Sequence, residues 1–197
     1  MKIYVTGLGV VSGIGLGVAE NIASLRKHQH GMGKVTLFPT ELDVPVSEVK
    51  YSNEELKRLL SLDIQKTFSR TALLGMLAAR EAVDDARLDL NTLRVGLISS
   101  TSVGGMDLSE HFYNAFKKDN RKGRLREVIS HDCGASTEMI ADYLKVNDFV
   151  TTISTACSSA ANAIMLGARM IRNGQLDAAI VGCLLYTSDA ADDLIGV

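Results

Sequence analysis

Short apolar runs alternate along this chain with segments in which apolar residues recur at helical spacing. The apolar runs have the length and the β-branched content of buried strands, and they cover residues 2–11, 93–99, 149–154 and 177–182. The helical pattern covers residues 18–27, 67–86, 107–118, 136–144 and 158–173. Because successive strands separated by helices need crossover connections, the pattern predicts an α/β fold with a mostly parallel sheet between helices.

Turn and capping residues mark several boundaries of these elements. Glycines crowd residues 12–17 and 101–105, which we predict to be turns. Ser52 and Glu55 have the spacing of a capping box and predict a further helix start. Residues 31–50 contain both prolines of the chain and are expected to be irregular.

Composition excludes several classes of protein. The chain has 197 residues, of which 46% are hydrophobic and 22% charged, with a formal net charge of -2. That mix supports a folded core and excludes a disordered chain, a collagen-like fibre and a disulfide-stapled mini-protein. The near-neutral charge gives no reason to expect nucleic acid as a partner. The chain begins with a strand-like run instead of a signal peptide, and none of its apolar runs approaches the roughly 18 residues of a membrane span.

The three cysteines, Cys133, Cys157 and Cys183, are widely separated. They form no Cys-x-x-Cys pair and no zinc-finger spacing with histidine, so we expect no metal site. An odd set of isolated thiols is typical of the reducing environment of the cytoplasm, where we expect the protein to reside.

Cys157 is distinguished by its local sequence, TTISTACSSAA over residues 151–161. A predicted strand ends there, a tight bend follows, and the cysteine falls in the first turn of a predicted helix. The free N–H groups and the dipole at a helix start favour a thiolate. Small neighbours, among them Ala156 and Ser158, leave room for a bulky thioester to approach the sulfur. The sequence therefore favours a nucleophilic role for Cys157 over burial as a small apolar residue.

Five stretches of residues 1–182 form a recognisable series. They are VTGLGVVSGIG (5–15), SRTALLGMLAAREAVDDA (69–86), STSVGG (100–105), ISTACSSAANAI (153–164) and GARMIRNGQLDAAIVG (167–182). In their order and spacing, the chain resembles the N-terminal half of a β-ketoacyl-acyl carrier protein synthase, a condensing enzyme of the thiolase-like fold. The resemblance implies one half of a duplicated, layered α/β architecture.

The same resemblance implies a decarboxylating Claisen condensation in fatty acid or polyketide and polyene biosynthesis. Cys157 would receive an acyl group from an acyl carrier protein. A malonyl-carrier protein would then lose carbon dioxide and attack the resulting thioester. The family uses no organic cofactor beyond the phosphopantetheine arm of the carrier protein, and its members are dimers. Its oxyanion hole uses the backbone N–H of the cysteine and one further backbone N–H.

Other positions take their expected roles from the resemblance. Val103 matches the position whose side chain limits the length of the acyl chain, with gap filling in a turn as the alternative. Ala156 and Ser158 are expected to border the substrate pocket beside Cys157. A basic group matches the region where family members receive the acidic carrier protein, with a solvated loop as the alternative. This group comprises Lys122, Arg124 and Arg126.

The chain departs from the family at the catalytic histidines. Both lie in the family's second half, and this chain has about half of the family's length. The four histidines present lie outside the family's histidine motifs; they are His28, His30, His111 and His131. We therefore expect that this polypeptide alone does not form carbon–carbon bonds.

Residues 183–197 break the pattern. One set of codons for their first six residues, TGT CTC TTA TAC ACA TCT, resembles the mosaic-end adaptor of transposase-made sequencing libraries. We interpret residues 1–182 as a truncated N-terminal domain and residues 183–197 as a non-biological tail derived from the adaptor. A genuine surface tail is the alternative.

Two other functions remain open at this stage. A short-chain dehydrogenase would use the glycines of residues 9–15 to bind a nicotinamide dinucleotide and the pair Tyr113 and Lys117 for catalysis, yet it leaves the cysteine motif unexplained. A chain-length factor, the non-catalytic partner subunit of polyketide systems, resembles a synthase but lacks the nucleophile. The presence of Cys157 argues against this second alternative.

Overall fold

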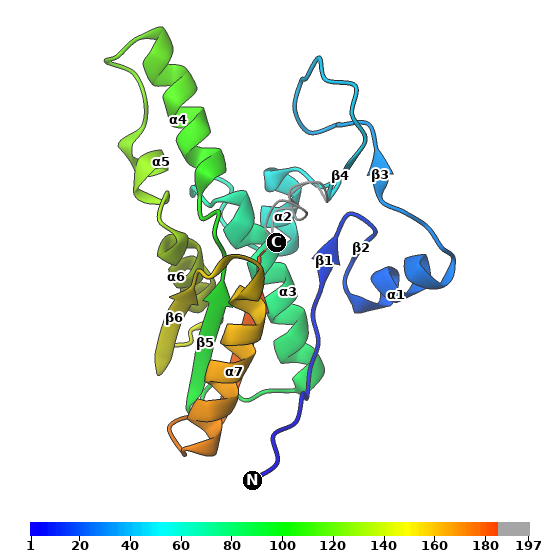
Figure 1. Cartoon of the computed structure of the whole chain (residues 1–197). Coiled ribbons are helices and arrows are strands. Elements are labelled where there is room, and N and C mark those ends of the chain that lie inside the picture. The colour runs from blue at the N-terminus through cyan, green and yellow to red at the C-terminus, as the bar shows by residue number, and fades with distance from the viewer. Residues whose placement is uncertain (185–197) are drawn as a thin grey trace.

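The fold is built around a parallel sheet. A computed structural model describes residues 1–184 and is shown in Figure 1. In its three-stranded sheet, β5 (Val95–Ser100) lies between β6 (Phe149–Ile153) and β7 (Ala178–Cys183), and both pairs are parallel. The predicted α/β class and its parallel sheet are therefore confirmed, as are the strands predicted over residues 93–99, 149–154 and 177–182.

Helices cover both faces of this sheet (Figure 1). One face is covered by α7 (Ser159–Arg172), which packs against β5 and β7. The other face is covered by α3 (Arg70–Ala86) and α6 (Cys133–Leu144). Apolar side chains of α3, α6 and β5 form the core, to which α2 (Asn53–Leu59) adds the fully buried Leu56.

A glycine brings α7 close to the sheet. A Cβ atom at Gly167 would lie 2.9 Å from Val181 Cγ1 and 3.2 Å from Ala179 Cβ, both on β7. Because glycine lacks this atom, the helix packs directly on the strand. The start of α7 is thereby held at the C-terminal edge of the sheet.

Polar caps start α2 and α3, and the cap of α2 is the one that the sequence predicts. Ser52 Oγ accepts a hydrogen bond from Glu55 N at 3.2 Å, and Glu55 Oε2 accepts one from Ser52 N at 2.7 Å. This reciprocal pair is the predicted capping box, and it begins α2. At α3, Ser69 Oγ accepts from Ala72 N at 3.1 Å. Both caps supply acceptors for N–H groups that have no partner within the helix.

The strand predicted over residues 2–11 is wrong for residues 2–10, which have no regular secondary structure and run along α3 (Figure 1). Carboxylates of α3 take the place of a partner strand: Asp85 Oδ2 accepts from Leu8 N at 2.9 Å, and Glu81 Oε2 accepts from Val10 N at 3.0 Å. The apolar pattern does not report this arrangement, because it cannot show where backbone N–H groups find acceptors. Since β5 already has a strand on each side, its edges are closed to the segment.

A short hairpin connects this segment to the first helix. It pairs β1 (Val11–Ser12) with β2 (Gly15–Leu16) and leads into α1 (Val18–Arg26). Glu81 Oε1 accepts from Val18 N at 2.7 Å, so a carboxylate of α3 caps α1. Beyond α1, residues 31–50 are largely irregular, as predicted, but they contain the two-residue strands β3 (Met32–Gly33) and β4 (Val46–Ser47), which were not predicted.

Two helices extend away from the sheet as a lobe (Figure 1). This α4–α5 lobe consists of α4 (Met106–Lys118) and α5 (Leu125–Ile129), which pack on each other. His111 Nδ1 on α4 lies 3.1 Å from Glu127 Oε1 on α5 and joins the two helices. None of the residues of α4 is fully buried, so the lobe is largely exposed.

Within residues 1–184, we find no helix that combines the length and the apolar character needed to cross a membrane. The boundary predicted after residue 182 falls within β7, which ends at Cys183. Residues 185–197, which make up most of the predicted adaptor tail, lie outside the described residues.

Candidate active site

The C-terminal ends of β5 and β6 meet beside the predicted nucleophile. Thr101 N donates to Ile153 O over 3.2 Å, and Ser102 Oγ lies 3.3 Å from Ser154 Oγ. These contacts connect the segment that follows β5 to the segment that follows β6. The carboxyl edge of a parallel sheet is where α/β folds place their ligands.

Cys157 lies in a tight turn between β6 and α7. The turn is a 3-10 helix, η1 (Ala156–Ser158), which continues directly into α7. Cys157 is exposed and carries a free thiol. Ala156 has a φ of 49°, in the left-handed region that residues other than glycine rarely adopt. The strand and the bend predicted before the helix are confirmed, but Cys157 lies in a 3-10 turn two residues before α7 and not in the first turn of that helix. The backbone is strained at the residue before the sulfur.

Ser159 holds this cysteine turn (residues 154–159) from the first turn of α7. Its hydroxyl accepts from Thr155 N at 2.8 Å and donates to Ala156 O at 2.7 Å. Only 1% of Ser159 is exposed, so water does not compete for these two bonds. The sequence alone does not reveal this role of Ser159.

Asn162 adds hydrogen bonds one turn further along α7. Its Nδ2 atom donates to Thr155 Oγ1 at 2.9 Å and to Ser158 Oγ at 3.4 Å. Ser158 Oγ donates in turn to Thr155 O at 2.7 Å. Steps of three or four residues separate Thr155, Ser158 or Ser159, and Asn162, and this helical spacing of polar residues is the sequence signal for the network.

The loop that carries Val103 borders the same edge of the sheet. Val103 is half-buried, and its backbone N–H donates to Thr101 Oγ1 at 3.2 Å. A Cβ atom at Gly105 would lie 2.0 Å from Ser130 O, so the loop is packed closely against the turn before α6. The structure thus brings the loop of Val103 next to the cysteine turn, which contains Ala156, Cys157 and Ser158.

The predicted carrier-protein residues lie on the α4–α5 lobe. A Cβ atom at Gly123 would lie 2.5 Å from Phe112 on α4, so the chain that carries these residues runs beside the middle of that helix. Lys122 Nζ lies 3.8 Å from Asp119 Oδ2. Arg124 is the N-cap of α5 and Arg126 lies on α5, and both are exposed. The structure places these three basic residues together on the lobe but does not bring them to Cys157.

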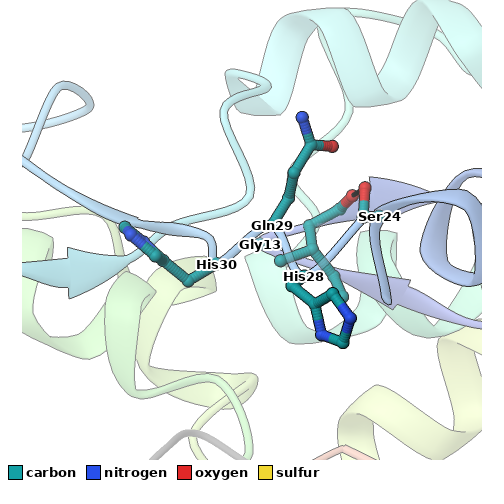
Figure 2. A pocket seen from close by; sticks show the side chains of 6 residues that line it. Gly13, Ser24, His28, Gln29 and His30 are labelled. Atoms are coloured by element: carbon teal, nitrogen blue, oxygen red, sulfur yellow. Dashed lines mark hydrogen bonds between the residues drawn. The ribbon is translucent and has the colours of Figure 1, made fainter. Parts of the chain in front are cut away.

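The histidines make other contacts. His131 Nδ1 lies 2.9 Å from Ser109 Oγ on the α4–α5 lobe. Figure 2 shows His28 and His30 pointing away from each other at an open cavity of about 460 Å3. The other residues that line it are Gly13, Ile14, Ser24 and Gln29. Cys157 is not part of this cavity, and residues 1–184 contain no group of three or more His, Cys, Asp or Glu residues placed to hold a metal ion.

Comparison with protein families bears on the three interpretations of the sequence. The family described as "Beta-ketoacyl synthase, N-terminal domain" matches residues 1–189. The chain belongs to the β-ketoacyl synthase family.

Two curated relatives of this β-ketoacyl synthase domain are enzymes named 3-oxoacyl-acyl-carrier-protein synthase 2. The enzyme of Staphylococcus aureus strain MRSA252 is 27% identical over 191 residues, and that of Vibrio harveyi is 29% identical over 197 residues. Both matches cover 92% of this chain and 45% of the relative, so the chain spans about half the length of the curated relatives it matches.

Solved structures share the fold of this β-ketoacyl synthase domain. The ishigamide ketosynthase/chain length factor matches with a TM-score of 0.82 at 28% identity, over 97% of this chain and 49% of that chain. The ketosynthase ApeO in complex with its chain length factor ApeC, from Xenorhabdus doucetiae, matches with a TM-score of 0.65 over 92% of this chain and 47% of that chain. At 22% identity this second likeness concerns the fold alone. The expected thiolase-like layered α/β fold is therefore confirmed.

Family membership leaves the dehydrogenase interpretation without support. Tyr113 and Lys117 lie on the exposed α4, and 60% of Tyr113 is accessible. A dinucleotide-binding fold requires a sheet strand immediately before its phosphate-binding glycines. Here residues 2–10, which precede Gly13 and Gly15, form no strand. The β-ketoacyl synthase domain resembles ketosynthases and chain-length factors, and not dehydrogenases.

Proposed function

We propose that this domain is the N-terminal half of a 3-oxoacyl-acyl carrier protein synthase of fatty acid or polyketide synthesis, with Cys157 as its nucleophile. The observation that best supports the proposal is the position of Cys157. Its free thiol is exposed in a strained turn that continues into the 14-residue helix α7. The turn presents the sulfur to an incoming thioester at the C-terminal edge of the sheet.

The first half of the reaction is acyl transfer to Cys157. The thiolate attacks the thioester carbonyl of an acyl-carrier protein and forms a tetrahedral oxyanion. The intermediate collapses as the bond to the carrier's sulfur breaks, and that sulfur leaves with the electron pair and takes up a proton. The acyl group is now a thioester of Cys157. Backbone N–H groups at the turn would stabilise the oxyanion.

The second half forms the carbon–carbon bond. In a malonyl-carrier protein, the bond between the α-carbon and the carboxylate breaks and carbon dioxide leaves. The electron pair stays on the α-carbon, which attacks the carbonyl of the Cys157 thioester. Collapse of the new tetrahedral intermediate expels the Cys157 thiolate and leaves a 3-oxoacyl chain on the carrier. In the family two histidines assist this step, and we propose that the present chain alone does not complete it.

The remaining predicted residues receive supporting roles in this proposal. Ala156 and Ser158 flank Cys157 in η1 and border the path of the acyl group. Val103, on the adjoining loop, limits the length of the acyl chain. The basic residues of the α4–α5 lobe receive an acidic acyl carrier protein, in its acyl and malonyl forms. We further propose that the full-length protein is a homodimer and uses no organic cofactor of its own.

We also propose that residues 183–197 derive from a sequencing adaptor. The codon match in the sequence supports this interpretation. Reading the gene from genomic DNA beyond codon 182 tests it. An acidic residue soon after Gly182 and two histidines further downstream would support both the adaptor origin and the enzyme assignment. Genomic codons that continue as CLLYTSDAADD would contradict the adaptor origin.

A chain-length factor is the second candidate, because the matched ishigamide structure is named for a ketosynthase and a chain length factor together. Cys157 favours the catalytic subunit, since a chain-length factor needs no nucleophile. The two candidates differ in a measurable way. A ketosynthase domain becomes acylated on Cys157 by an acyl thioester, whereas a chain-length factor does not.

Alkylation of the folded chain tests the nucleophile. We expect iodoacetamide or cerulenin at neutral pH to label Cys157 faster than Cys133, as measured by mass spectrometry of the peptides. Cys157→Ser should abolish the fast label, and Cys133→Ser should leave it unchanged. Equal labelling of the two cysteines in a folded sample would contradict the proposal.

A further inference from the structure

Two polar residues of α7 are bonded to the turn that precedes them, and the proposed chemistry of Cys157 does not use them directly. We propose that Ser159 and Asn162 are positioning residues that hold Ala156 in its left-handed conformation and thereby fix the direction of the Cys157 thiol. The inference rests on the proposed function of Cys157. It adds which side chains make that cysteine reactive.

Ser159 bonds to the backbone on both sides of the strained position. Its hydroxyl accepts from Thr155 N and donates to Ala156 O, at 2.8 and 2.7 Å. Between that N–H and that carbonyl lie the φ and ψ torsions of Ala156. The two bonds therefore close a ring that keeps these torsions in place. Only 1% of Ser159 is exposed, so water cannot replace these two hydrogen bonds if the hydroxyl is removed.

Asn162 holds the same turn through side chains. Its amide donates to Thr155 Oγ1 at 2.9 Å, so Thr155 is bonded to α7 through its backbone and through its hydroxyl. Asn162 also reaches Ser158 Oγ at 3.4 Å, on the other side of Cys157. The residues before and after the cysteine are thus both fixed to one rigid helix.

The strain at Ala156 explains why such bonds are needed. An alanine at φ 49° is less stable than in ordinary backbone, so without added bonds the turn would relax to another conformation. Relaxation would rotate the peptide plane before Cys157 and move the sulfur off the start of α7. Glycine adopts the left-handed region without strain. A glycine at position 156 should therefore make the bonds from Ser159 and Asn162 less necessary.

This substitution supplies the test. The measured quantity is the ratio of iodoacetamide alkylation rates of Cys157 and Cys133 in the folded 197-residue chain. We expect Ser159→Ala to lower the ratio by roughly tenfold and Asn162→Ala by roughly threefold, because Ser159 bonds two backbone groups of the turn directly, whereas Asn162 bonds only side-chain hydroxyls. We expect Ala156→Gly, added to Ser159→Ala, to restore most of the ratio. A general loss of structure would not be rescued by glycine and would also change the rate at Cys133.

The outcomes separate this inference from the proposed function. If the unsubstituted chain shows no preference for Cys157, the nucleophile assignment fails. If it shows the preference and Ser159→Ala keeps it, or Ala156→Gly gives no rescue, the positioning role is wrong. If Ser159→Ala does not fold, Asn162→Ala provides the test, because Asn162 is partly exposed. The positioning role then requires that Asn162→Ala lowers the ratio and that Ala156→Gly, added to it, restores the ratio.

Discussion

The backbone N–H of Arg70 donates to Asp107 Oδ2 over 2.8 Å, so a carboxylate in the first turn of α4 accepts from the first residue of α3. This contact fixes the start of the α4–α5 lobe to the longest helix of the core. It also sets where the loop of residues 101–105 leaves the sheet. The Oδ1 atom of the same carboxylate is buried and has no partner within residues 1–184.

Removing this carboxylate should destabilise the domain. We expect Asp107→Ala to lower the free energy of unfolding by about 1 kcal/mol, the usual effect of losing an acceptor at a helix start. The measurement is urea unfolding followed by circular dichroism. Asp107→Asn is the matched control, because it keeps an oxygen for Arg70 N–H and should cost less. Equal losses for the two variants would contradict the role of the hydrogen bond.

Glu81 should hold the N-terminal segment on α3. It accepts from Val10 N and from Val18 N, so Glu81→Ala leaves two N–H groups without an acceptor. We expect cleavage within residues 1–17 by a dilute protease to speed up about fivefold, because local opening then exposes the segment. Asp84→Ala, on the same exposed side of α3, should leave the cleavage rate unchanged. A similar acceleration in both variants would indicate general loosening of the helix.

The N-terminal segment also needs glycine where it crosses α3. A Cβ atom at Gly9 would lie 1.9 Å from Ala78 O, in the backbone of the helix. Backbone cannot move aside as a side chain can, so Gly9→Ala should destabilise the domain by about 2 kcal/mol. Gly33→Ala serves as the control, since nothing lies within 4 Å of its Cβ position. Thermal unfolding should show a lower midpoint for the first variant and little change for the second.

Asp177 should make the domain sensitive to acid. Hydrogen bonds from the Arg94 guanidinium, and then from Arg94 N–H, lower the pKa of Asp177 from its ordinary 3.8 to about 2. Because the folded carboxylate stays ionised where the unfolded one is already protonated, its stabilisation is complete above the unfolded value. It is then lost as the pH falls from about 4 to about 2.

Asp177→Asn tests this dependence. The urea midpoints of wild type and variant should differ most above about pH 5 and converge as the pH approaches 2. Arg94→Ala removes the guanidinium but keeps the backbone N–H that also donates to Asp177, so its curve should lie between those of wild type and Asp177→Asn. A gap between wild type and variant that stays constant down to low pH would show that the pair does not titrate as described.

The basic residues of the lobe should differ in their effect on carrier-protein affinity. Lys122 lies 3.8 Å from Asp119, which offsets its charge, whereas Arg124 and Arg126 form no ion pair within the described part of the chain. We expect Arg124→Glu to weaken binding of an acyl carrier protein by about tenfold at low salt, and Lys122→Ala to weaken it less. Titration calorimetry at two salt concentrations measures this, with the distant Lys27→Glu as control. Equal weakening by Arg124→Glu and Lys27→Glu, which change the net charge by the same amount, would point to net charge alone.

Local signals made most of the fold predictable. The capping box at Ser52 and the apolar stripe of α3 follow from residues three or four positions apart, and such contacts form within one helix. The three sheet strands are short apolar runs between helices, which leaves few alternatives for them. The turn around Cys157 is predictable in the same way, because it is defined by the run of residues 151–161.

The rest depends on contacts between distant segments. Residues 2–10 have the composition of a strand, yet their N–H groups donate to carboxylates of α3 more than 70 positions away, at Glu81 and Asp85. No local pattern reports such a pairing. The left-handed φ of Ala156 was equally hidden, since the sequence shows an ordinary alanine in place of the glycine that would announce it.

The absence of a side chain at Gly167 limits which substitutions this protein can accept during evolution. Cys157 lies two residues before the start of α7. The distance between α7 and β7 therefore affects how far the Cys157 thiol lies from the ends of the strands. A larger residue at 167 would lift the whole helix unless position 179 or 181 became smaller. Homologues that keep the proposed role of Cys157 should therefore exchange side-chain volume among these three positions and seldom gain it at one alone.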